Sequence, residues 1–139
     1  MRHFPTIPGQ SGLATTRQLL EHGWTRSAVH HAVSTVCAVP LPGVIAPHRG
    51  HLTVDEWSAA RSLWAGPAGV LTGLAALAQH GITTGGRGPT IHRFLVWGPA
   101  RCRHAGYCVI TRSKRVPDRI EAGCVAYASA VRALVDAGR

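Results

Sequence analysis

The chain has 139 residues, of which 45% are hydrophobic and 15% are charged, and its formal net charge is +9 at pH 7. This balance is typical of a globular protein and excludes an intrinsically disordered chain. The sequence contains no run of 18 apolar residues, which excludes a membrane-spanning helix of ordinary length.

The positive charge is carried almost entirely by arginine, because Lys114 is the only lysine. Arginine forms forked hydrogen bonds with phosphates and guanines, so the excess favours a polyanionic partner, with nucleic acid first. A G+C-rich coding bias would explain the choice of arginine over lysine, but not the shortage of acidic residues.

The first residues, Met1 to Pro5, lack the apolar core of a signal peptide, so we expect a cytoplasmic protein. In that compartment the four cysteines are expected to be reduced. They are Cys37, Cys102, Cys108 and Cys124.

Residues 1–12 are rich in proline and glycine, which predicts an extended arm rather than a helix. A first short helix is expected over residues 15–22, with Thr15 or Thr16 accepting hydrogen bonds from its free N–H groups. Gly23 then ends this helix. Thr25 is placed to cap a second helix that runs to about Ser34.

The second helix divides completely into two faces at 100° per residue. Its small apolar face comprises Ala28, Val29, Ala32 and Val33. Its polar face comprises Arg26, Ser27, His30, His31 and Ser34. A helix of this kind after a tight turn is typical of the recognition helix of a helix-turn-helix.

Arg26 lies in the first turn of this helix, from which an arginine can donate two hydrogen bonds to guanine. The polar face therefore predicts base contacts by Arg26, Ser27, His30 and His31. The alternative is a solvated surface, because two helices around a glycine are common in any all-α domain.

Residues 36–47, VCAVPLPGVIAP, predict two short strands joined by a proline-glycine turn. Such a hairpin after a helix-turn-helix is the wing of a winged-helix domain. The expected tip holds no cation, so its contacts with a DNA backbone would be weak.

The runs GLATTRQLLEHGWTRSAVHHAV and LPGVIAP resemble the N-terminal winged-helix domain of the abortive-infection type IV antitoxin (AbiEi-like) family. GVLTGLAALAQHGI and ALVDAG are similar, more loosely, to later segments of that family. The resemblance implies operator binding, repression of the protein's own operon and a cognate toxin as a further partner.

Three features depart from the family pattern. Prolines replace the helix that usually precedes the GLAT opening. The residues between the recognition helix and the wing, Ser34 to Ala38, lack the usual arginines. The nuclease-like domain that follows in many relatives is not present in these 139 residues.

Residues 51–139 predict a second domain. Thr53 and Glu56 form a capping box for a helix to about Ala65, with Val54, Trp57, Ala60, Arg61 and Trp64 on its packed side. A buried helix over residues 72–80 follows, then a glycine-rich loop at 83–89 that is either a connector or a phosphate contact. Two strands are expected at 91–97 and 107–111 as a basic hairpin, and a last helix at 126–137.

We expect a further set of residues to contact DNA phosphates through their cations, or through hydroxyls at helix starts. For each of these the alternative is a solvated surface position. They are Thr15, Thr16, Arg17, Thr25, Arg87, Arg101, Arg103, Arg112, Lys114 and Arg115.

The sequence contains no motif that predicts a catalytic or a metal site. Cys102 and Cys108 are separated by five residues and no paired ligands follow at zinc-site spacing, so no metal or other cofactor is expected. The order of Lys114 before Asp118 and Glu121 is opposite to the usual arrangement in metal-dependent nucleases. We therefore interpret the chain as a binding protein.

The sequence thus predicts an α+β protein with a winged helix-turn-helix at 1–50 and a domain of helices and a short antiparallel sheet at 51–139. The predicted function is sequence-specific binding of double-stranded DNA as a transcriptional repressor, as an antitoxin-type autoregulator. The alternatives are a protein-interaction module that neutralises a toxin, and a degenerate nuclease. The oligomeric state is left open.

Overall fold

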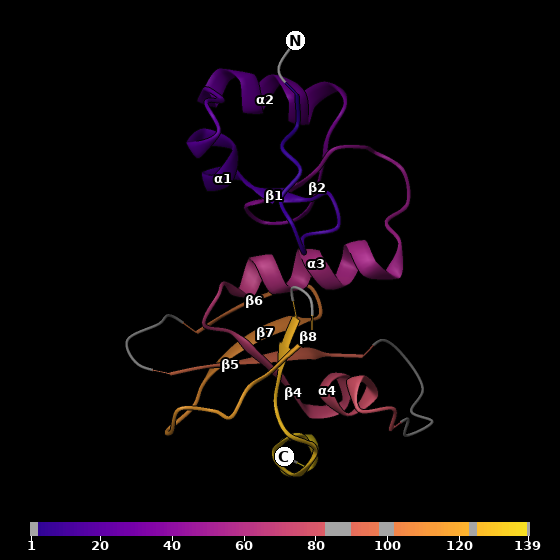
Figure 1. Cartoon of the computed structure of the whole chain (residues 1–139), viewed down its shortest axis with the longest axis vertical. Coiled ribbons are helices and arrows are strands. Elements are labelled where there is room, and N and C mark those ends of the chain that lie inside the picture. Colours follow the sequence, from indigo (N-terminus) through magenta and orange to yellow (C-terminus); the bar gives the residue numbers. More distant parts are fainter. Residues whose placement is uncertain (1–2, 83–89, 98–101, 123–124, 139) are drawn as a thin grey trace. The chain divides into compact units, whose positions relative to one another are not determined.

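The computed structural model describes residues 3–82, 90–97, 102–122 and 125–138. The chain divides into two compact units, Met1–Trp64 and Ala65–Arg139, and each is described by itself. Both contain helices and strands, which confirms the predicted α+β class (Figure 1). The sequence-based division after residue 50 grouped the helix that follows with the second domain, whereas these units group most of it with the first.

The two predicted helices of the first unit are confirmed. Helix α1 spans Thr16–Glu21 and begins with a capping box. In it the Thr15 hydroxyl accepts from the Gln18 N–H at 3.1 Å, and the Gln18 amide oxygen accepts from the Thr15 N–H at 2.9 Å. Gly23 follows with a φ of 89°, a left-handed conformation that turns the chain toward the next helix.

Helix α2 spans Arg26–Thr35, and Thr25 caps it as predicted by accepting from the Ala28 N–H at 3.1 Å. The predicted wing also forms. Strand β2, Ala38–Leu41, pairs antiparallel with β3, Val44–Ala46, across a turn at Gly43 with a φ of 78°. A two-residue strand that the sequence did not predict, β1 at Ala14–Thr15, pairs antiparallel with β3.

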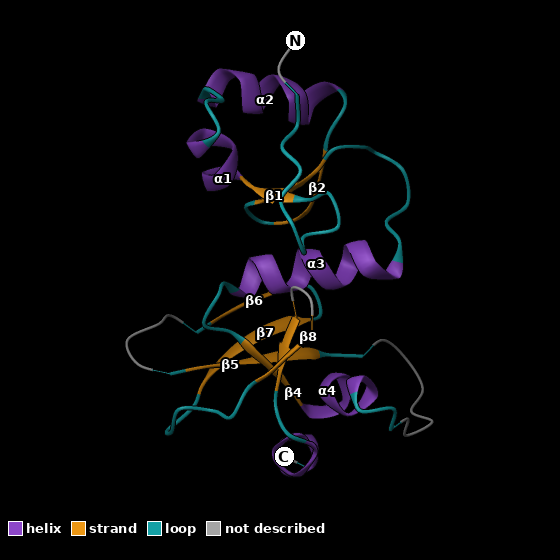
Figure 2. Cartoon of the chain, in the orientation of Figure 1, coloured by secondary structure: helices purple, strands orange, loops and turns teal. Residues whose placement is uncertain are grey.

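The core of the first unit lies between α1, α2 and the small sheet (Figure 2). Its fully or nearly buried members are Ala14, Leu19, Val29, Ala32, Cys37 and Ile45. Burial raises the pKa of the Cys37 thiol, and the nearby Arg49 guanidinium partly opposes that shift. Cys37 is 3% exposed and contributes to the core as a small apolar side chain.

Residues 3–12 contain no helix, as their prolines and glycines predicted, but they pack against the core of the first unit instead of standing as a free arm. Phe4 and Ile7 pack against the core, and the Phe4 ring meets the Trp24 ring edge to face at 6.1 Å. The chain then turns over residues 8–12. There the buried Gln10 exchanges two side-chain hydrogen bonds with Gln18, at 2.9 and 2.8 Å. The prolines and glycines exclude a helix here, but they do not prevent apolar side chains between them from packing.

Helix α3 spans Val54–Ala65, and its predicted capping box is confirmed. The Glu56 N–H donates to the Thr53 hydroxyl at 3.1 Å, and Glu56 Oε1 accepts from the Thr53 N–H at 2.9 Å. The hydrogen bond from the Thr53 N–H lowers the pKa of Glu56. A second hydrogen bond, between the His48 ring and Glu56 Oε2, lowers it further. Of the predicted packed side, Ala60 and Trp64 are buried and Trp57 and Arg61 are half-buried, but Val54 is 82% exposed.

The second unit contains a six-stranded sheet in the order β6-β7-β5-β4-β9-β8. The strands are β4 Val70–Thr72, β5 His92–Val96, β6 Arg103–Ala105, β7 Cys108–Arg112, β8 Ile120–Ala122 and β9 Val125–Tyr127. The sheet is mixed, because β5 pairs parallel with β7 and β4 pairs parallel with β9.

The predicted basic hairpin between residues 91–97 and 107–111 is therefore wrong in its pairing. These two strands run parallel, and β6, from the segment between them, forms the hairpin with β7. Strands β4, β8 and β9 were also missed. Each has three residues, which is too short for an alternating pattern to identify.

Helices α4, Gly73–Gln79, and α5, Ala130–Ala137, pack against each other and against β4. The last helix was predicted to begin at residue 126, but α5 begins four residues later, at Ala130. Residues 126–127 belong to β9, and Ser129 caps α5. A buried polar link ties strand to helix. The Thr72 hydroxyl donates to Asp136 Oδ2 at 2.7 Å, and Arg132 Nε donates to the same oxygen at 2.9 Å.

Candidate nucleic-acid interface

The side chains predicted to contact bases lie together on the outer face of α2. Arg26, Ser27, His30 and His31 are all exposed. Further along the helix, the hydroxyls of Ser34 and Thr35 donate to the carbonyls of His30 and His31, each at 2.8 Å. Those two hydroxyls are thus engaged with their own helix, which leaves the four predicted residues as the outward donors of this face.

The opposite face of α2 fixes the direction in which these donors point. Val29 and Ala32 are each 8% exposed in the core, and Val33 packs against it. A second anchor was missed by the sequence analysis. The Arg49 guanidinium donates to the carbonyl of Val33, near the end of α2 where helix carbonyls lack partners. The sequence does show a cation, Arg49, just after the wing. That it bonds to the carbonyl of Val33 depends on the path of the folded chain, which the sequence does not show.

The residues at the helix starts that were predicted to contact phosphates differ in their exposure and in the partners that they already have. The Thr15 and Thr25 hydroxyls accept capping hydrogen bonds, and each retains its own proton for donation. Arg17 is 89% exposed but pairs with Glu21 at 3.3 Å, so a phosphate would compete with that carboxylate. Thr16, the first residue of α1, is half-buried.

Four of the six cations of the second unit that were predicted to contact phosphates lie in the part of the chain that the structure describes. Arg87 and Arg101 lie outside the described residues. Arg103 in β6 is exposed, as are Arg112, Lys114 and Arg115, which follow one another at and beyond the end of β7. These last three line one pocket, and Arg103 is not among its lining residues.

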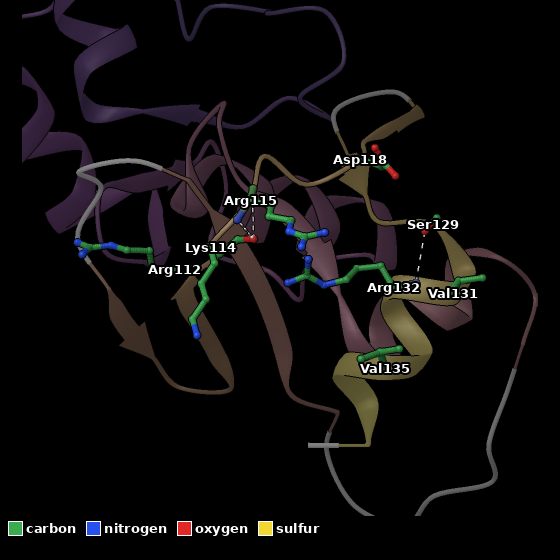
Figure 3. Close-up of a pocket in the computed structure, with 9 residues that line it drawn as sticks. Arg112, Lys114, Arg115, Asp118, Ser129, Val131, Arg132 and Val135 are labelled. Atoms are coloured by element: carbon green, nitrogen blue, oxygen red, sulfur yellow. Dashed lines mark hydrogen bonds between the residues drawn. The ribbon is translucent and has the colours of Figure 1, made fainter.

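The pocket brings in a cation that the sequence analysis did not select, Arg132 of α5 (Figure 3). Arg132 follows Arg115 by seventeen positions in the sequence, so no local motif joins them. Ten of the fifteen basic residues and three of the six acidic residues lie in residues 65–139, a net charge of +7, which leaves +2 for residues 1–64. The exposed polar face of α2 and most of the positive charge thus belong to different units.

In the part of the chain that the structure describes, no three His, Cys, Asp or Glu side chains gather as metal ligands. Nor does that part include a helix with the length and apolar character needed to cross a membrane. No protein-family model, curated protein or solved structure matches this chain.

Proposed function

We propose that the first unit binds a specific sequence of double-stranded DNA with α2 in the major groove, and that the protein represses transcription. One observation carries this proposal. The outer face of α2 presents Arg26, Ser27, His30 and His31 to solvent while Val29 and Ala32 hold its inner face in the core. A rigid helix with donors along one face after a tight turn is the arrangement by which helix-turn-helix proteins contact base edges.

Arg26 takes the leading role because it lies in the first turn of α2, where it can reach O6 and N7 of one guanine. Ser27, His30 and His31 contact the neighbouring base pairs along the groove. The Thr25 hydroxyl and Arg17 contact phosphates beside it. The wing contributes shape more than charge, since its turn at Pro42 and Gly43 carries no cation.

The second unit adds sequence-independent attraction. Its net charge of +7 raises affinity for any duplex and steers the encounter, with Arg103, which does not line the pocket, among the exposed cations that contact phosphates. In this proposal the protein is a cytoplasmic binding protein and not an enzyme. The resemblance to AbiEi-like antitoxins supports an autoregulator of its own operon.

The salt dependence of binding tests whether double-stranded DNA is the partner at all. Selection from random or genomic fragments should yield a preferred duplex, and its association constant should fall steeply as salt is raised. Each phosphate that the protein neutralises adds about 0.9 to the slope of the log–log plot. A flat response, or no duplex binding at low salt, would remove DNA as the partner.

A second candidate function, binding of a protein such as a cognate toxin, is favoured by an exposed apolar face of α5. Val131, Leu134 and Val135 are 75%, 65% and 50% exposed, and their spacing places them on one side of the helix. An exposed patch of this kind is typical of interaction sites. If it binds a toxin, Leu134→Asp should abolish neutralisation when the two proteins are produced together, and leave duplex binding unchanged.

A further inference from the structure

The pocket of the second unit has a volume of about 640 Å³ and is lined by four cations, Arg112, Lys114, Arg115 and Arg132. Small-ligand sites in proteins have volumes of about 300–1,000 Å³, so the pocket is large enough for a ligand of several functional groups. The surface of a DNA duplex is convex, and side chains gathered in a hollow are poorly placed to follow it.

Two of these cations converge. Figure 3 shows the Arg115 and Arg132 side chains pointing toward one another, whereas Arg112 points away from that pair. Arg132 comes from α5, where its Nε is held by the buried Asp136 carboxylate at 2.9 Å. Arg115 comes from the segment after β7, where its backbone N–H and carbonyl both hydrogen bond to the buried Ser113 hydroxyl, at 3.3 and 2.7 Å.

Two guanidinium groups held so that they face each other repel, and an anion between them reverses that repulsion. The planar fork of arginine matches phosphate oxygens in particular. The start of α5 adds to this preference, because Ser129 caps that helix and also lines the pocket. Its free N–H groups carry partial positive charge, and the Ser129 hydroxyl retains a proton to donate.

The remaining lining distinguishes a nucleotide from a bare phosphate. Val131 and Val135 provide apolar surface beside the cations, which suits the face of a base. Asp118 places one carboxylate in an otherwise cationic pocket. A carboxylate repels a phosphate but accepts hydrogen bonds from sugar hydroxyls, so it favours a ligand that carries both groups.

We propose that this pocket binds a nucleoside monophosphate, with its phosphate between Arg115 and Arg132, its sugar hydroxyls toward Asp118 and its base against Val131 and Val135. The site goes beyond the DNA-binding function proposed above and depends on residues of the second unit alone. It would give the protein a small-molecule ligand in addition to its duplex.

The test uses the full chain and isothermal titration at fixed ionic strength. The probes are adenosine 5′-monophosphate, guanosine 5′-monophosphate, adenosine and inorganic phosphate. At least one of the two nucleotides should bind at least tenfold more tightly than adenosine or phosphate. Saturable binding of neither nucleotide, or equal binding of phosphate, would overturn the proposal.

Matched variants locate the site. Arg115→Gln should weaken nucleotide binding about tenfold, as expected for the loss of one charge-assisted hydrogen bond. Arg119→Gln removes the same charge from a residue that pairs with Glu121 at 3.0 Å and does not line the pocket, so it should leave the affinity unchanged. Equal losses in both variants would contradict the assignment. Arg132 is left intact because its replacement would disturb Asp136.

A competition experiment separates a free nucleotide from a nucleic-acid backbone as the occupant. Nucleotide binding should persist when the protein is saturated with duplex. Displacement by duplex would assign the pocket to the DNA backbone and contradict a separate nucleotide site. If no duplex binds at all, the DNA-binding proposal fails, and the titrations with nucleotides still decide on the pocket.

Discussion

Asp136→Ala is expected to lower the free energy of unfolding of the second unit by about 3 kcal/mol. Asp136 is 4% exposed, and its Oδ2 accepts from the Thr72 hydroxyl at 2.7 Å and from Arg132 Nε at 2.9 Å. Without the carboxylate, the fully buried Thr72 hydroxyl loses its acceptor, which is the larger cost. The Arg132 side chain is 33% exposed and can be rehydrated, so the loss lies at the lower end of values for buried ion pairs.

Asp136→Asn is the matched control, because it keeps the shape of the side chain and an oxygen acceptor while it removes the charge. It should cost about 1–2 kcal/mol, between wild type and alanine. Urea unfolding followed by far-ultraviolet circular dichroism measures all three proteins. An alanine variant within about 0.5 kcal/mol of wild type would mean that this polar link contributes nothing to stability.

Ala32→Arg is expected to unfold the first unit, at a cost of about 3 kcal/mol or more. Ala32 is 8% exposed and packs in the core with Leu19 and Val29, where a guanidinium would find neither space nor a partner. Duplex binding should be lost for every sequence, because α2, the proposed recognition helix, loses its packing against the core.

His31→Arg introduces the same side chain one position earlier in α2, on the exposed face. It should leave the melting temperature unchanged and alter the preferred DNA sequence. Thermal unfolding of both variants, followed by duplex titration, separates the two faces of the helix. Equal melting temperatures for the two variants would contradict the packing of α2 described above.

The parts of the fold that local chemistry specifies were predictable from the sequence. Thr15, Thr25 and Thr53 are capping residues at helix starts, and each caps the helix predicted for it. The two-faced pattern of residues 26–34 predicted the face of α2 that packs, on which Val29 and Ala32 are buried and Ala28 and Val33 are half-buried. These features depend on residues within four positions of one another, so a single sequence contains the information.

The parts that depend on distant pairing were not predictable in this way. The parallel pairing of β5 with β7 joins segments separated by a third strand, and nothing in either segment encodes its partner. The pocket depends on the same kind of information, because it brings Arg132 of α5 beside the residues after β7. The packing of Phe4 and Ile7 was not predictable because proline and glycine around them exclude a regular element, so these apolar residues show no periodicity that would mark them as buried.

Binding by the Arg26→Ala variant tests the central proposal, base recognition by α2, most directly. Arg26 is exposed and outside the core, so the variant should keep its melting temperature and lose at most about 0.5 kcal/mol of stability. Titration against the selected duplex should show a loss of about 1–3 kcal/mol, with discrimination relaxed at one or two base pairs. A scrambled duplex should show a much smaller loss, because only phosphate attraction remains there. Equal affinities of the variant and the wild type for both duplexes would contradict base recognition by Arg26.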